Sequence, residues 1–105
     1  MKCVKNATAS DKRLLINEAS LISHLQSDEL IKCVDLYDWC KSIYMIVELM
    51  DRDMAPICLT GQQNYSEDFC RYTLYKVAKG LQAMHNKNVL HRDIKSDNVL
   101  YTLDG

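Results

Sequence analysis

Three side chains with complementary chemistry lie within six residues of one another near the end of the chain, at Asp93, Lys95 and Asn98. A carboxylate can accept a proton from a hydroxyl group, an ammonium group can neutralise charge on phosphoryl oxygens, and an amide oxygen is a hard ligand suited to Mg²⁺. The same residue types also form ordinary charged surface turns, so the cluster alone leaves a structural interpretation open. The spacing of these residues helps to decide between a catalytic site and a surface turn.

The segment from His91 to Leu100 reads H-R-D-I-K-S-D-N-V-L. It resembles the catalytic loop of eukaryotic protein kinases, H-R-D-x-x-x-x-N, with a lysine two residues after the aspartate. Five fixed positions would match by chance in roughly one of tens of thousands of chains this long. The spacing therefore favours the catalytic interpretation over a surface turn.

The resemblance implies a role for each residue of the loop. Asp93 is expected to align the substrate hydroxyl and accept its proton, and Lys95 to contact the γ-phosphate and the substrate oxygen. Asn98 is expected to bind Mg²⁺. In the family, the histidine equivalent to His91 belongs to a packed apolar spine, and the arginine equivalent to Arg92 often holds a phosphorylated activation loop.

A helix is expected after the polar break at residues 6–10, with Ser10 as its N-cap and Asp11 in its first turn. Its apolar residues fall at helical spacing on one stripe, and Glu18 lies on the same stripe. An inward carboxylate requires a cationic partner or a solvated cleft, although an exposed glutamate at the rim remains an alternative. The apolar members of this predicted stripe are Leu14, Leu15, Ile22 and Leu25.

The resemblance supplies a partner for Glu18. Residues 2–5, K-C-V-K, look like the family's V-A-I-K strand. This match makes Lys5 the lysine that binds the α- and β-phosphates of ATP, with Glu18 as its ion-pair partner. Only the lysine agrees outright, because Lys2 replaces valine and Cys3 replaces alanine, so an ordinary surface lysine is the alternative for Lys5.

Two strands are expected at residues 30–37 and 43–47, joined as a hairpin that lacks an Asn-Gly or Asp-Gly turn. In the family, the second strand leads through a gatekeeper, here Val47, into the hinge. Main-chain groups of Glu48 and Met50 are then expected to meet the adenine edge, with Leu100 and Cys3 against its faces.

The longest expected helix covers residues 66–86, with Ser66 as N-cap and Pro56 in the first turn of a shorter helix before it. Short strands are expected at residues 89–90 and 99–101, on either side of the catalytic loop. The predicted buried stripe of the long helix consists of Cys70, Leu74, Val77, Ala78, Leu81 and Met84.

These elements predict an α+β chain with a partial protein kinase fold. Residues 1–50 are expected to form part of the N-lobe and the hinge, and residues 51–105 part of the C-lobe with its long helix and catalytic loop. Lys95 favours serine/threonine over tyrosine specificity. The sequences at residues 15–18 and 94–98 look most like the STE group. The kinase resemblance implies ATP and Mg²⁺ as ligands and serine or threonine hydroxyl groups of proteins as substrates. It does not identify upstream regulators.

Composition limits the binding partners and the cellular locations that we expect. The 105 residues carry 13 basic and 14 acidic side chains, a balance that gives no electrostatic reason to expect nucleic acid or an anionic membrane. The five cysteines form no C-x-x-C pair and fit a closed disulfide framework poorly. With no long apolar run and no signal peptide, we expect a cytoplasmic protein with reduced thiols and no membrane insertion.

The 105 residues contain no G-x-G-x-x-G loop before Lys5 and no D-F-G, and we expect them to lack kinase activity in isolation. Exposed apolar surface is also expected, because the long helix normally packs in a larger helical lobe and the strand carrying Lys5 needs neighbours on both sides. Three interpretations remain open: part of an active kinase, a pseudokinase-like binding module, or a short product that regulates a complete kinase. The intact set of charged and ligating side chains at Lys5, Glu18, Asp93, Lys95 and Asn98 argues against a mere scaffold.

Overall fold

The computed structural model describes residues 1–60 and 65–103, which form two compact units, Met1–Glu48 and Leu49–Gly105. The first unit contains a three-stranded antiparallel sheet and one helix, and the second contains two helices and a two-stranded sheet. This combination confirms the predicted α+β class. Among the described residues, no helix is long and apolar enough to cross a membrane.

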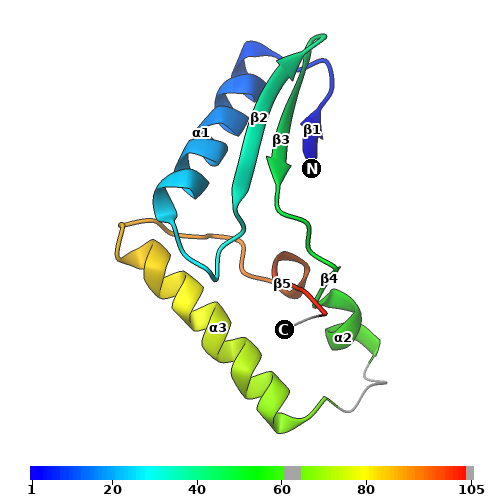
Figure 1. The fold of residues 1–105 in the computed structure, drawn as a ribbon, viewed down its shortest axis with the longest axis vertical. Helices are drawn as coiled ribbons and strands as arrows, with labels where there is room; N and C mark the ends of the chain where they lie inside the picture. The colour runs from blue at the N-terminus through cyan, green and yellow to red at the C-terminus, as the bar shows by residue number, and fades with distance from the viewer. Residues whose placement is uncertain (61–64, 104–105) are drawn as a thin grey trace. The chain divides into compact units, whose positions relative to one another are not determined.

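The sheet of the first unit has the strand order β1–β3–β2, with β1 at Lys2–Val4, β2 at Cys33–Trp39 and β3 at Ser42–Val47. Helix α1, Ala9–Leu25, lies along one face of this sheet (Figure 1). Side chains from the helix and the central strand form the core. Its buried members are Leu15, Ala19, Ile43 and Met45.

Helix α1 begins two residues earlier than expected. Thr8, not Ser10, is the N-cap, because its Oγ accepts the Asp11 N–H at 3.2 Å while Oδ2 of Asp11 accepts the Thr8 N–H at 2.9 Å. The predicted stripe was also wrong at one position, since Leu14 is 66% exposed whereas Leu15 is 3% exposed. Ala19 takes the buried position that completes the stripe.

The β2–β3 hairpin is confirmed, although its turn has an unusual sequence. Trp39 pairs with Ser42, which leaves Cys40 and Lys41 as a two-residue loop. Both have positive φ, 49° and 62°, as the mirror-image turns that suit hairpins require. The first strand begins at Cys33 instead of residue 30, and a bulge lies between Cys33 and Asp35.

In the second unit, strand β4 at Arg52–Asp53 pairs with β5 at Leu100–Tyr101, and helix α2 covers Ala55–Thr60. The long helix α3 covers Glu67–His85 with Ser66 as N-cap, as predicted. Residues 89–90, expected as a strand, form none, and β4 was not anticipated.

The predicted buried stripe of α3 is only partly correct. Met84 is buried, Val77 and Leu81 are half-buried, and Leu74 is 70% exposed. Cys70 and Ala78 are exposed as well. The apolar face of this helix therefore has little to pack against within the described residues, which confirms the expectation of exposed apolar surface.

Candidate active site

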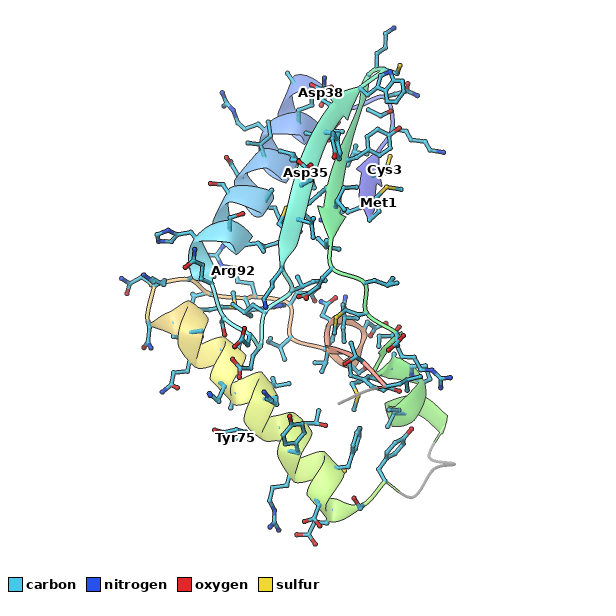
Figure 2. All side chains as sticks on the ribbon, viewed as in Figure 1. Met1, Cys3, Asp35, Asp38, Tyr75 and Arg92 are labelled. Carbon is cyan, nitrogen blue, oxygen red and sulfur yellow. The ribbon has the colours of Figure 1, made fainter. Side chains whose placement is uncertain are left out.

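The residues of the predicted catalytic loop form a tight turn in the second unit. Arg92, labelled in Figure 2, has a φ of 68°, a left-handed conformation that is uncommon for a side chain of this size. The Asp93 N–H donates to Nδ1 of His91 at 3.2 Å. The 3₁₀ turn η1, Ser96–Asn98, then brings the chain back, with the Asn98 N–H bonded to the Lys95 carbonyl at 3.0 Å.

This turn gathers the three side chains that the sequence singled out. Nζ of Lys95 lies 3.2 Å from Oδ2 of Asp93. Nδ2 of Asn98 donates to the same Oδ2 at 3.0 Å and to the Asp93 carbonyl at 2.8 Å. The contacts from Lys95 and then Asn98 lower the pKa of Asp93 below its ordinary value of 3.8. Its carboxylate is therefore ionised at neutral pH.

The loop is anchored at one buried position that the sequence analysis did not identify. The N–H of Met54 is shared between the carbonyls of Ser96 at 3.2 Å and Val99 at 2.9 Å. The Met54 side chain is buried. Nearby, Oδ2 of Asp51 accepts the Leu103 N–H at 2.8 Å, which ties the segment after β5 to the segment before β4. No local motif in residues 51–54 signals these contacts.

Asn98 is oriented suitably for a divalent cation. Both of its described side-chain hydrogen bonds use Nδ2, which leaves the amide oxygen Oδ1 as a possible ligand. Within the described residues, no group of three or more His, Cys, Asp or Glu side chains could hold a metal ion. The Oδ1 of Asn98 is of the oxygen type that Mg²⁺ takes as a ligand alongside waters and phosphate oxygens.

The prediction that Lys5 forms the ion pair with Glu18 is wrong, because Lys2 is the lysine that pairs with Glu18. Nζ of Lys2 lies 2.6 Å from Oε2 of Glu18, with both side chains about half exposed. Lys2 pairs with Met45 and Val4 pairs with Ile43, so these two of the three β1 residues lie on the sheet face that carries the core. Lys5 follows the end of the strand and is exposed.

A strand's alternation explains the error. Residues two apart share a face, whereas a shift of three residues moves a side chain to the other face. Val4, the one aliphatic residue among Lys2–Val4, was the available signal, because a core-facing Val4 places Lys2 on the core face. The same register places Cys3 on the opposite face, away from Lys2.

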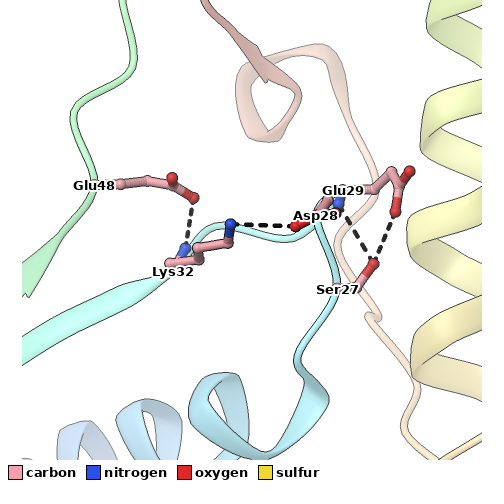
Figure 3. A network of polar contacts seen from close by, with 5 residues as sticks. All are labelled: Ser27, Asp28, Glu29, Lys32 and Glu48. Atoms are coloured by element: carbon pink, nitrogen blue, oxygen red, sulfur yellow. Dashed lines mark hydrogen bonds and ion pairs between the residues drawn. The ribbon is translucent and has the colours of Figure 1, made fainter.

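The expected adenine-binding residues are divided between the two units. Glu48 is fixed in the first unit by Lys32, whose N–H donates to Oε1 of Glu48 at 2.7 Å (Figure 3). The Lys32 carbonyl also accepts the Glu48 N–H at 3.0 Å. The Glu48 N–H is thereby engaged within the protein. In the second unit, Met50 is half-buried and Leu100 lies in β5 opposite Asp53.

The sequence matches the family described as "Protein kinase domain" over residues 1–105. Mitogen-activated protein kinase 13 of Arabidopsis thaliana is 35% identical, over 91% of this chain and 29% of that protein. Extracellular signal-regulated kinase 1 of Dictyostelium discoideum is 34% identical, over 90% of this chain and 18% of that protein. The chain thus spans less than a third of these curated relatives. With its H-R-D-x-x-x-x-N loop folded around Asp93, this chain belongs to the protein kinase domain family.

Proposed function

We propose that this chain supplies the catalytic loop and part of the ATP site of a protein serine/threonine kinase. The observation that carries the proposal is the Asp93 carboxylate, which contacts both Nζ of Lys95 and Nδ2 of Asn98 within one turn. An ionised carboxylate can orient a serine or threonine hydroxyl and accept its proton. The relatives named as mitogen-activated protein kinases support the same class of reaction.

In the proposed reaction, the substrate hydroxyl oxygen forms a bond to the γ-phosphorus of ATP while the bond from that phosphorus to the bridging β-phosphate oxygen breaks. The hydroxyl proton passes to Asp93, and ADP leaves. Lys95 neutralises charge on the transferring group as a point charge. When bound through Asn98, Mg²⁺ would supply further charge neutralisation on the phosphates.

We assign the α- and β-phosphate contact to Lys2 in place of Lys5. Glu18 holds the Lys2 ammonium at 2.6 Å and thus directs it without occupying all three of its N–H donors. Glu48 and Met50 at the hinge, and Leu100 against the adenine ring, remain part of the proposal. For Glu48 the carbonyl is the group assigned to adenine, because its N–H is bonded to Lys32.

Two finer assignments belong to the proposal. Lys95 supports serine/threonine specificity, and the sequences at residues 15–18 and 94–98 support the STE group, although the relatives named above are mitogen-activated protein kinases. A cytoplasmic location is supported by the free thiols of Cys3, Cys33, Cys40 and Cys70. The side chain of Cys58 lies outside the described part of the structure. A noncatalytic binding module is not favoured, because it has no need of Asp93, Lys95 and Asn98 gathered in one turn.

The test compares Asp93→Asn with Asp97→Asn in the native protein that contains these residues. Asp97 is an exposed carboxylate in the same turn, so its variant controls for loss of one negative charge. We expect Asp93→Asn to lower kcat by about 10²–10⁴ and Asp97→Asn to leave it within about threefold. Equal activity of the wild-type protein and Asp93→Asn would refute the proposal.

A further inference from the structure

The sheet face opposite helix α1 is rich in aromatic side chains. In the β2–β3 register, Tyr37 is directly opposite Tyr44, and Cys3 of β1 pairs with Tyr44 from the other side. These positions alternate with the core residues Leu36 and Met45, so they belong to the face that α1 does not cover.

A hollow of about 700 Å³ lies on the first unit at this place. Trp39 is 72% exposed and Tyr37 is 54% exposed. A hollow of this volume falls in the range that accommodates a small ligand or a few peptide side chains. It is lined by Met1, Tyr37, Asp38, Trp39, Tyr44 and Ile46.

One carboxylate beside the hollow carries an uncompensated negative charge. Oδ1 of Asp35 accepts the Leu36 N–H at 2.7 Å, and Asp35 lies opposite Ile46, a residue that lines the hollow, on the sheet face that also carries the Tyr37 hydroxyl. The hydroxyl and then the backbone N–H lower the pKa of Asp35, so the group is ionised at neutral pH. Among its described contacts there is no cationic side chain. Figure 2 marks Asp35 on β2.

The second carboxylate at the hollow is different. Oδ1 and Oδ2 of Asp38 both lie 2.7 Å from Nζ of Lys12 in α1, so its charge already has a partner. Asp35 flanks the hollow opposite Ile46 without lining it, and its described contacts include no cationic side chain. No lysine or arginine is among the residues that line it.

We propose that this hollow binds an arginine side chain presented between apolar residues of a partner peptide or protein. A guanidinium is weakly hydrated, stacks on aromatic rings and pairs with a carboxylate through two parallel hydrogen bonds. Tyr37, Trp39 and Asp35 offer both kinds of partner at one place. A purely apolar occupant would instead cover a carboxylate without pairing it, which is unfavourable.

Trp39 lines this hollow, so its emission reports on binding there, and Trp39→Phe in the native protein identifies the part of the signal that comes from Trp39. The experiment titrates the native protein, without nucleotide, with the peptide acetyl-Leu-Arg-Leu-amide and follows Trp39 emission. The matched probe replaces arginine by citrulline, which keeps the shape and removes the charge. We expect saturable change with arginine and about fivefold or more weaker binding with citrulline.

Two variants locate the charge. Asp35→Asn is expected to weaken binding of the arginine peptide to about the level of the citrulline peptide. Asp28→Asn removes an exposed carboxylate outside the hollow and is expected to leave binding unchanged. Circular dichroism confirms that both variants are folded, and the comparison of the two peptides needs no variant at all.

Three results would overturn the inference. Equal affinity for the arginine and citrulline peptides would indicate an apolar surface without charge recognition. Emission that changes with protein concentration in step with dimer formation would indicate a second copy of the chain. Unchanged emission up to millimolar peptide would indicate no site. None of these results bears on Asp93 or Lys2, so the kinase proposal stands or fails separately.

Discussion

Lys2 and Glu18 join the first strand of the sheet to helix α1 through a 2.6 Å ion pair. The two side chains are 53% and 42% exposed, so the pair lies in a solvated position. Exposed ion pairs contribute little to stability, because water already solvates both charges. We therefore expect the main role of the Lys2–Glu18 ion pair to be the orientation of Lys2 toward a ligand.

We predict that Glu18→Gln separates stability from nucleotide binding. The free energy of unfolding should fall by less than about 1 kcal/mol, because the pair is half exposed. The KM for ATP should rise or kcat should fall by about tenfold or more, because Lys2 loses its orienting partner. Denaturant titration measures the free energy of unfolding, and steady-state kinetics measures KM for ATP and kcat. Unchanged kinetic constants in Glu18→Gln would contradict an orienting role.

The Asp93 pKa should respond to its neighbour Asn98. In Asn98→Ala the pKa of Asp93 should rise toward 3.8, because one of the hydrogen bonds that lowers it is removed. NMR titration of the Asp93 carboxyl carbon measures this directly. Asp97→Ala, which changes an exposed neighbour, is the control and should leave the pKa of Asp93 unchanged.

The same shift predicts the sign of a pH effect on stability. Because the folded pKa of Asp93 is depressed, its contribution is present above about 3.8 and disappears as the pH falls through the folded value. Asn98→Ala should therefore be less stable than the wild type at pH 6, with the difference narrowing toward pH 2. A difference that widens as the pH falls would contradict this linkage.

The cap of α1 offers a test with a built-in control. Thr8→Ala should destabilise the first unit by about 1 kcal/mol, because it removes the Thr8 Oγ that accepts the Asp11 N–H, while the backbone N–H of residue 8 can still donate to Asp11. Ser10→Ala, two residues into the helix, should cost almost nothing, since alanine is the better helix former there. Chemical denaturation measures the stability loss of each variant. A larger loss in Ser10→Ala than in Thr8→Ala would indicate that Ser10 is the N-cap.

The buried face of α1 can be tested with two adjacent leucines. Leu15→Ala should destabilise by about 2–5 kcal/mol, because it opens a cavity against Ile43 and Met45. Leu14→Ala should cost less than about 1 kcal/mol, because that side chain is largely exposed. Similar losses for both variants would show that the helix is rotated about its axis.

The catalytic turn could be predicted from sequence because its information is local. Asp93, Lys95 and Asn98 lie within six residues, so their spacing alone fixes which side chains can meet. The cap at Ser66 and the long helix α3 were accessible for the same reason. Each depends on backbone groups a few residues away.

Long-range pairings were not accessible in this way. The choice between Lys2 and Lys5 depends on which face of a three-residue strand meets Met45, some forty residues later. Likewise, Met54 becomes an anchor only because Ser96 and Val99 return to it. The burial of α3 was overestimated because an amphipathic pattern shows which face can be buried, and not whether a neighbouring element covers it.

The lysine that contacts the nucleotide phosphates can be identified with an acyl-phosphate derivative of ATP, which transfers its acyl group to a nearby lysine amine. Mass spectrometry of the labelled native protein then compares Lys2 with Lys5, and exposed Lys41 gives the background rate. We predict acylation of Lys2 that excess ATP suppresses, with Lys5 at background. ATP-protected acylation of Lys5, with Lys2 at background, would contradict the assignment of the Lys2–Glu18 pair to the nucleotide site.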